Sequence, residues 1–269
     1  MKGTIVTGAN GFIGSSLIKI LINKGVKVLA VDMSFALPRL PESGFITKIE
    51  SGVDATLADK IPVGEYDAFY HLAWRGVNGA EKADPTVQLV NIQMAVDCAN
   101  VCKQMGVKKL LCAGTVAENA TYSLPDLEKT SGGMMYGVAK HACRLIVEDY
   151  CKNIGLPFVW MQFSNIYGIG NKTGNLVSYT LSELMAGKEA TFGPALQPYD
   201  FIYVDDLIEA VYRLGVNDTK KSFYYIGSGN PRILKDYLLR IGELAGFADK
   251  VGIGIRPDDG IKYSMEEDS

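Results

Sequence analysis

The stretch Thr7-Gly8-Ala9-Asn10-Gly11-Phe12-Ile13-Gly14 decides the fold of this chain. It follows a short run rich in β-branched residues at 3–6, which predicts a strand. Residues 15–25 come next, with an apolar helical pattern that a glycine closes, and a second predicted strand at 26–31 ends at Asp32. This order of strand, glycine turn, helix and strand predicts a βαβ unit that binds a dinucleotide.

Each glycine of the turn has its own part in this interpretation. Gly8 permits the tight turn, Gly11 lets the backbone approach a pyrophosphate, and Gly14 lets the helix pack closely on the strand. The N-terminus of the helix then offers unpaired N–H groups to the phosphates. Asp32 stands where a carboxylate accepts hydrogen bonds from the adenosine ribose, which favours NAD because the carboxylate repels the 2′-phosphate of NADP.

Strands and helices alternate through more than half of the chain. Further strands are predicted in 47–54, 66–74, 109–113 and 157–163, and helices in 55–60, 85–105 and 136–153. The alternation predicts an α/β fold, a Rossmann doubly wound parallel sheet. Past Asn165 the rhythm breaks into a helix at 176–186, a strand near 198–206 and a helix at 206–214.

We therefore expect two parts with a cleft between them. Residues 1–165, with a return segment at 199–214, form the NAD-binding Rossmann domain in this interpretation. Residues 166–198 and 215–269 form a small C-terminal substrate-binding lobe.

The composition is that of an ordinary globular protein. The chain has 269 residues, 48% hydrophobic and 21% charged, with a net charge of −3. Because cations are not clustered, we expect no nucleic-acid partner, and no apolar run approaches the roughly 18 residues that span a bilayer. The five cysteines are scattered and have no histidine nearby at metal-ligand spacing. We therefore expect no metal site, and buried thiols in a reducing, cytoplasmic setting.

The strongest catalytic signal is Tyr136-Gly137-Val138-Ala139-Lys140, in which tyrosine and lysine lie one helical turn apart. The ammonium of Lys140 is expected to lower the pKa of the Tyr136 phenol and make it a general base for a hydroxyl group. A surface Tyr–Lys pair is the alternative. Thr115 ends a predicted strand, where α/β sheets bind ligands, so it either holds the reacting oxygen or caps a turn.

Together these features resemble the extended short-chain dehydrogenase/reductase family, the NAD-dependent epimerase/dehydratase type that acts on nucleotide sugars. Four further stretches are similar to motifs of that family: His71-Leu72-Ala73, Ser164-Asn165-Ile166-Tyr167-Gly168, Asp200-Phe201-Ile202-Tyr203-Val204-Asp205-Asp206 and Arg256-Pro257-Asp258-Asp259. The resemblance implies a catalytic triad of Thr115, Tyr136 and Lys140. It also implies a homodimer formed through the helices at 85–105 and 136–153.

The resemblance further implies which residues contact each ligand. For NAD these are Gly8, Asn10, Gly11, Phe12, Ile13, Gly14, Asp32, Met33, Val53, Leu72, Ala73, Trp74, Asn91, Tyr136, Lys140 and Phe163. For the nucleotide sugar they are Thr115, Asn165 and Arg256, the last of which is expected on a diphosphate. His71 is equally compatible with packing at a strand end, and Trp74 with covering an edge of the core.

The chain departs from the family at several positions. Tyr199 replaces an arginine that contacts the diphosphate, and Gly52 replaces an acid that contacts adenine. Dehydratases carry an Asp-Glu pair directly after the catalytic threonine, and this chain has Val116-Ala117 there. The sequence therefore predicts an NAD-dependent nucleotide-sugar 4-epimerase. The alternatives are an NAD(P)-dependent reductase of a 4-keto-sugar and, from another class, a non-catalytic dinucleotide-binding regulator, which would not need a tuned phenol.

Overall fold

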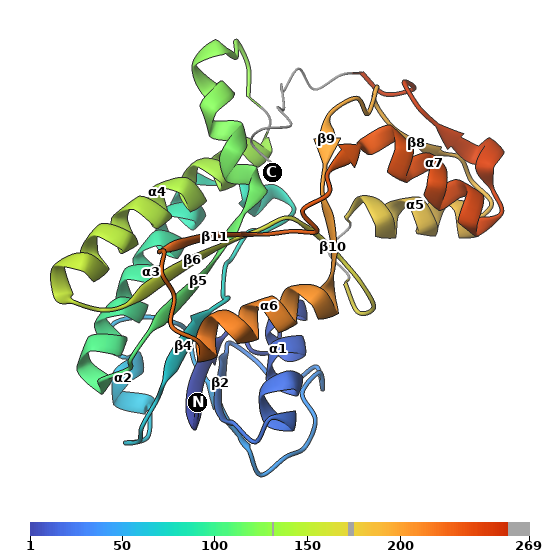
Figure 1. Cartoon of the computed structure of the whole chain (residues 1–269). Coiled ribbons are helices and arrows are strands. Elements are labelled where there is room, and N and C mark those ends of the chain that lie inside the picture. The colour runs from blue at the N-terminus through green and yellow to red at the C-terminus, as the bar shows by residue number, and fades with distance from the viewer. Residues whose placement is uncertain (131, 172–174, 258–269) are drawn as a thin grey trace.

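The computed structural model describes residues 1–130, 132–171 and 175–257, and its centre is a seven-stranded parallel sheet (Figure 1). The strand order is β11-β6-β5-β4-β1-β2-β3. The strands are β1 (Gly3–Thr7), β2 (Lys27–Asp32), β3 (Ile46–Glu50), β4 (Ala68–His71), β5 (Leu110–Thr115), β6 (Phe158–Phe163) and β11 (Phe223–Ile226). The chain starts in the middle of the sheet and winds outward in both directions, which confirms the predicted doubly wound architecture.

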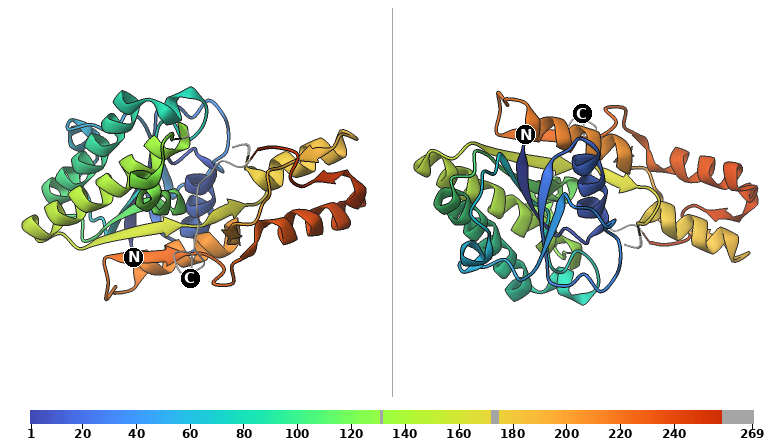
Figure 2. Two further views of the ribbon diagram at one scale, coloured as in Figure 1. Left: turned by 90° about the horizontal axis from the view of Figure 1, so that it is seen from above. Right: turned by 90° about the horizontal axis from the view of Figure 1, so that it is seen from below.

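Helices cover both faces of this sheet (Figure 2). On one face α1 (Phe12–Asn23) and α6 (Val204–Val216) pack in a first hydrophobic cluster. On the other face α2 (Leu57–Lys60), α3 (Pro85–Met105) and α4 (Gly132–Ile154) pack in a second. Strand β4 serves both clusters, since Phe69 belongs to the second and Tyr70 to the first, and both are fully buried. This burial on two faces explains why the central strands β1, β4 and β6 are largely apolar and fully buried, whereas the edge strand β3 is not.

All five cysteines belong to the second cluster and are unpaired. They are Cys98 and Cys102 on α3, Cys112 on β5, and Cys143 and Cys151 on α4, and none is more than 1% exposed. Burial raises the pKa of these thiols. They are therefore inert core side chains in the folded chain.

A second, smaller body extends from one end of the sheet, with α5 (Leu176–Met185) beside α7 (Leu234–Ala245) (Figures 1 and 2). Its core contains six buried hydrophobic residues, among them Leu184, Phe192 and Leu238. Short strand pairs fasten it: β7 (Asn165–Tyr167) with β10 (Phe201–Tyr203), β8 (Ala190–Thr191) with β13 (Val251–Gly252), and β9 (Pro198–Tyr199) with β12 (Arg232–Ile233). Three 3₁₀ segments complete the described elements: η1 (Ala80–Ala83), η2 (Val116–Asp126) and η3 (Ala248–Lys250).

The structure differs from the sequence-based division at one strand. β11 lies within 215–269, the segment assigned to the lobe, yet it pairs with β6 in the main sheet through Phe223 and Trp160. A four-residue edge strand carries little local signal, because its place is set by a partner far away in the chain. Among the described residues, no helix is both long and apolar enough to cross a membrane.

Candidate active site

The glycine turn brings α1 very close to the carboxyl end of β1. Gly8 has a φ of 66°, and a Cβ atom added there would lie 2.8 Å from the Ala73 nitrogen. A Cβ atom on Gly14 would lie 2.1 Å from the Gly8 carbonyl oxygen. Only glycine fits these two positions. No side chain caps α1 at Gly11, and its first turn holds no acidic residue, so its first N–H groups remain available for an anion.

Asp32, at the end of β2, is bonded to the same turn. Its carboxylate accepts hydrogen bonds from the backbone N–H of Asn10 and of Met33, both at 2.8 Å. The Asn10 side-chain amide donates to the Ser34 carbonyl at 2.9 Å. The loop after β2 is thereby fixed against the glycine turn. Three predicted cofactor residues, Asn10, Asp32 and Met33, are thus neighbours in space.

A cavity of about 710 Å³ opens at this turn. Eight predicted residues line it: Gly8, Gly11, Phe12, Ile13, Gly14, Leu72, Trp74 and Asn165. Ten lining residues were not predicted: Arg39, Val77, Asn78, Ser164, Ile166, Asn171, Asn175, Leu176, Tyr199 and Phe201. Most of these come from loops and from the smaller body. Ser164, Ile166 and Phe201 lie in motifs that the sequence identified, and so they carried a usable signal.

The cavity fits a dinucleotide by size and by chemistry. Its volume lies in the range of small-molecule sites. Two buried polar atoms on residues that line it, Ser164 Oγ and Asn175 Nδ2, have no hydrogen-bond partner in the part of the chain that the structure describes. Buried polar atoms are normally paired, so these two are suited to meet a polar ligand.

Thr115, Tyr136 and Lys140 come together at the ends of β5 and α4. The Tyr136 hydroxyl is hydrogen-bonded to the Thr115 side chain. Lys140 lies one helical turn beyond Tyr136, and its Nζ is 6.0 Å from the centre of the Tyr136 ring. The same Nζ donates to the Ala113 carbonyl at 2.6 Å and stands 3.6 Å above the Trp74 ring. The surface-pair alternative is therefore wrong, because Lys140 is only 4% exposed.

The pKa of Tyr136 differs from the sequence-based expectation, in which Lys140 lowers it. Burial raises the pKa of the Tyr136 phenol in this structure. Burial also lowers the pKa of Lys140 to about 8. The reason is geometric, since the ammonium is directed to Ala113 and Trp74 and not to the phenol oxygen. A tyrosinate at neutral pH therefore requires a further positive charge near the phenol.

Both interpretations of Thr115 are compatible with the structure. Its Oγ1 accepts a hydrogen bond from the Ala117 N–H at 3.2 Å, which caps η2, while the same side chain bonds to Tyr136. Glu118 completes a capping box, with its carboxylate accepting from the Thr115 N–H at 2.7 Å and from Trp160 Nε1 at 3.1 Å. Glu118 is 2% exposed and faces the core. It is thus placed to support Thr115 from behind.

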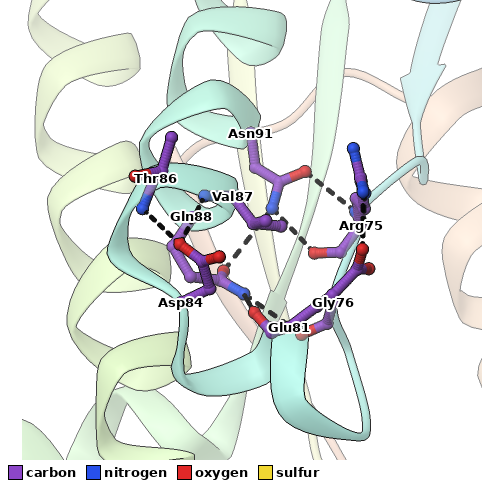
Figure 3. Close-up of polar contacts among 8 residues, drawn as sticks. All are labelled: Arg75, Gly76, Glu81, Asp84, Thr86, Val87, Gln88 and Asn91. Carbon is purple, nitrogen blue, oxygen red and sulfur yellow. Dashed lines mark hydrogen bonds and ion pairs between the residues drawn. The ribbon is translucent and has the colours of Figure 1, made fainter.

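Asn91 holds the loop between β4 and α3 (Figure 3). Its amide accepts from the Arg75 N–H and donates to the Arg75 carbonyl, both at 2.8 Å, and the residue is fully buried. In this position the amide orders the loop backbone, and the direct contact with the cofactor that the resemblance implies stays a prediction. Gln88 acts similarly and accepts a hydrogen bond from Trp74 Nε1 at 2.8 Å.

Three other predicted residues are buried in, or packed against, the hydrophobic core. Phe163 is 4% exposed in the first hydrophobic cluster, and Val53 packs against the second. His71 is buried, with Nδ1 at 2.9 Å from Thr7 Oγ1 and 3.3 Å from Cys98 Sγ, as the packing interpretation predicts. In the described part of the chain, no group of three or more His, Cys, Asp or Glu residues is arranged to hold a metal ion.

Arg256 lies in the smaller body, on a second cavity of about 480 Å³. Its Nε donates to Thr191 Oγ1 at 3.0 Å, and its guanidinium stands 5.0 Å from the centre of the Tyr179 ring. Leu176 lines both cavities, so they adjoin. The rest of the predicted motif, Asp258 and Asp259, lies outside the described residues. Tyr199, which stands where the family has an arginine, lines the first cavity and packs on Phe201 at 4.9 Å between ring centres.

Comparison with known proteins decides the family. The sequence model of the NAD-dependent epimerase/dehydratase family matches residues 4–227. The chain belongs to this family. A dTDP-6-deoxy-L-talose 4-dehydrogenase (NAD(+)) of Aggregatibacter actinomycetemcomitans is 26% identical over 86% of this chain and 86% of its own length. A UDP-glucose 4-epimerase of Mycolicibacterium smegmatis is 25% identical over 92% of this chain and 84% of its own.

Solved structures of the same type share the fold. The UDP-N-acetylglucosamine 4-epimerase of Methanobrevibacter ruminantium has a TM-score of 0.80 and 22% identity, covering 98% of this chain and 88% of that one. The UDP-glucose 4-epimerase of Thermus thermophilus, solved in complex with NAD, has a TM-score of 0.77 and 21% identity, covering 97% and 88%. The family match confirms the predicted family, with its enzymatic nature and its dependence on NAD. The solved structures confirm the Rossmann fold.

Proposed function

We propose that this enzyme is an NAD-dependent nucleotide-sugar 4-epimerase. The observation that carries the proposal is the hydrogen-bonded pair Thr115–Tyr136, with buried Lys140 one turn along α4. Such a pair offers one oxygen that accepts a proton and a second that holds the reacting carbinol oxygen. Relatives named as UDP-glucose 4-epimerases support the choice of reaction.

In this mechanism Tyr136 takes the proton from the sugar 4-hydroxyl at its phenol oxygen. Thr115 donates a hydrogen bond to the same substrate oxygen, and Glu118 keeps Thr115 in place through its backbone N–H. NAD, held at the glycine turn, would supply the hydride acceptor and a positive charge. Because burial raises the pKa of Tyr136, the phenolate form that accepts the proton requires a positive charge nearby. Hydrogen bonds oriented in advance toward the developing oxyanion provide most of the rate.

The two cavities suit the two ligands of this reaction. Residues of the glycine turn and of the loop after β2, with Asp32, would hold NAD, and Asn165 and Arg256 would hold the nucleotide sugar. We propose that residues 1–165 with 199–214 bind the cofactor. The smaller body, 166–198 together with the part of 215–269 beyond β11, would bind the substrate. Elements of both parts line the first cavity, which supports this division.

A second candidate is reduction of a nucleotide-linked 4-keto-sugar. It is favoured by the relative that is named as a dTDP-6-deoxy-L-talose 4-dehydrogenase. The same three side chains would serve, because reduction is one half of the epimerase cycle. The two functions differ in whether the cofactor is consumed.

Product analysis separates these functions. The enzyme with NAD would be incubated with UDP- and dTDP-linked hexoses, and the sugar configuration at C4 followed by NMR together with the absorbance of reduced nicotinamide. An epimerase interconverts the C4 epimers without net formation of NADH. A dehydrogenase or ketoreductase changes the cofactor in proportion to product. Bound NAD without turnover of any sugar nucleotide would contradict both and favour the regulator.

We also propose that α3 and α4 form the interface of a homodimer. Their outer faces expose Leu89, Val90, Leu145 and Ile146, each between 48% and 65% exposed. The two helices pack against each other, and exposed apolar residues on packed helices are typical of an interface. Leu145→Arg should shift the chain toward the monomer in sedimentation equilibrium, whereas Leu244→Arg on α7, which is also exposed, should not. A monomeric unmodified chain would contradict the proposal.

A further inference from the structure

Lys82 occupies an unusual place for a lysine. It lies in η1, between β4 and α3, and its Nζ stands 5.2 Å from the centre of the Tyr136 ring. The side chain is half-buried, and burial lowers its pKa. The catalytic tyrosine therefore has a second ammonium group near it, from a different element than Lys140.

The loop that carries Lys82 is held firmly (Figure 3). The Gln88 side-chain amide donates to the carbonyls of Gly76 and Glu81, both at 3.1 Å. Asp84 accepts from the Thr86 N–H at 2.8 Å and so caps α3 directly after η1. Two buried side chains of α3, Gln88 and Asn91, thus fix the backbone before the lysine, and the Asp84 cap fixes it after. These hydrogen bonds order the loop that carries Lys82 over the Tyr136 ring.

No carboxylate neutralises this ammonium in the part of the chain that the structure describes. Its neighbour Glu81 pairs with Arg75, and Asp84 is engaged by the N-terminus of α3. Glu118, the buried acid closest in sequence to the triad, faces Thr115 and Trp160. A partly desolvated cation without a counter-ion is unfavourable. We therefore expect such a cation at a site where a ligand brings a negatively charged group.

The position of Lys82 indicates which part of the ligand brings that anion. Under the proposed function, the oxygen on C4 of the sugar meets Tyr136. A carboxylate on C5 is attached to the neighbouring carbon, whereas the diphosphate is attached across the ring at C1. The diphosphate also has its own candidate cation, Arg256, on the adjoining cavity in the smaller body. The ammonium at Tyr136 is thus better placed for a substituent of the reacting ring.

Resting on the proposed function, we propose that Lys82 binds a carboxylate on the reacting sugar ring, so that the preferred substrate is a nucleotide-linked uronate. The carboxylate supplies the counter-ion that Lys82 lacks, and the ion pair orients the ring with C4 toward Tyr136. A neutral hexose leaves the ammonium unpaired in the occupied site. Lys82 is then a specificity-determining residue contributed by the loop between β4 and α3.

Binding measurements test this without requiring turnover. The NAD-loaded enzyme would be titrated by calorimetry with UDP-glucuronate and UDP-glucose, which differ at C6 alone. The unmodified chain should bind the uronate more tightly. Lys82→Met keeps the length of the side chain and removes the charge, and should reduce the ratio of the two affinities by roughly 10- to 100-fold, as for a lost hydrogen bond to a charged group. Lys82→Arg should retain much of the preference, and Lys103→Met, exposed on α3, should retain all of it.

Three results would overturn the inference. An unchanged affinity ratio in Lys82→Met would exclude a carboxylate contact. An equal loss for both sugars would place Lys82 on the diphosphate, and a loss of NAD affinity alone would place it on the cofactor. Failure of the proposed function would appear elsewhere, as an absence of C4 epimerisation, while the affinity ratio would still report on Lys82.

Discussion

The two regions that hold the candidate site residues are built in different ways. On the sheet side, Lys140 is 4% exposed on α4 and Thr115 ends the parallel strand β5, two elements that pack in the large hydrophobic clusters. In the smaller body, Arg256 is exposed and contacts Thr191 and Tyr179, among strands of only two or three residues. If the proposed roles are right, the main core positions the reacting groups. The smaller body, with its own hydrophobic core, can then vary in substrate contacts without disturbing them.

The largest effect is expected on the sheet side, from Tyr136→Phe. If the phenol transfers the proton, kcat should fall at least roughly 10²–10⁴-fold, as for the loss of a general base. NAD affinity should stay nearly unchanged, because the ring and the fold remain. Steady-state kinetics and cofactor titration measure the two quantities. Tyr212→Phe on α6, remote from the cavity, should retain normal turnover.

Near-normal turnover by Tyr136→Phe, on a substrate that the enzyme demonstrably converts, would contradict the proton-transfer role of Tyr136. It would also remove the main reason for placing the reacting groups at the carboxyl ends of the sheet.

Lys140→Met tests how much the buried Lys140 ammonium lowers the free energy of unfolding. Burial lowers the pKa of Lys140 to about 8, from an unfolded value of about 10.4. The unfolded chain then binds more protons between these values, so the contribution of this group to stability rises with pH across about 8 to 10.4. Below pH 8 the buried charge costs about 3 kcal/mol. Lys140→Met removes this cost, and the Ala113 carbonyl loses a donor at every pH.

Urea denaturation of both chains at several pH values checks this. The free energy of unfolding of the Met variant, relative to the unmodified chain, should be most favourable at pH 7 and should decline toward pH 10. A difference that stays constant with pH would contradict the buried, weakened charge.

Arg256→Ala acts in the smaller body, on the adjoining cavity, and should have a smaller effect. If Arg256 pairs with the diphosphate, affinity for the nucleotide sugar should fall by about 1.5–3 kcal/mol. NAD affinity and the free energy of unfolding should hardly change, because the side chain is exposed and its partners are neutral. Calorimetric titration measures both ligands, with Arg240→Ala on α7 as the matched control. Loss of NAD affinity alone would reverse the assignment.

Asp32→Ala should have the smallest effect. Its carboxylate accepts from two backbone N–H groups and has capacity left for ribose hydroxyls. The unmodified chain should prefer NAD to NADP, and the substitution should narrow that preference by roughly tenfold, about 1.4 kcal/mol. Equal affinities for the two cofactors in the unmodified chain would refute the role of Asp32.

The features that were predicted best from the sequence are those that neighbouring residues in the chain determine. Helix α3 was predicted at its observed bounds, since Asp84 caps it, Pro85 begins it and Gly106 ends it. The glycine turn and the spacing of Tyr136 and Lys140 were equally local. Helix α7 was not predicted, although Leu234, Leu238 and Ala245 follow a helical spacing that Gly246 closes. That signal was present in the sequence.

Other parts could not be predicted because distant segments place them. Strand β9 meets β12 through Tyr199 and Arg232, and this pairing carries Tyr199 into the cavity wall. The pKa of Tyr136 depends on where the Lys140 ammonium is directed, which spacing along a helix does not determine. The role of Asn91 depended on a loop whose backbone it bonds.

The cysteine arrangement gives this chain a built-in reporter of its own opening. The five thiols lie on two helices and one strand of the same hydrophobic cluster, and none is more than 1% exposed. An alkylating reagent can reach them only when that cluster opens, so alkylation rates under native conditions measure the free energy of opening. Thiols that react at a common rate define one cooperative unit. Mass spectrometry of partly alkylated chains would thus map how the layer behind the triad comes apart.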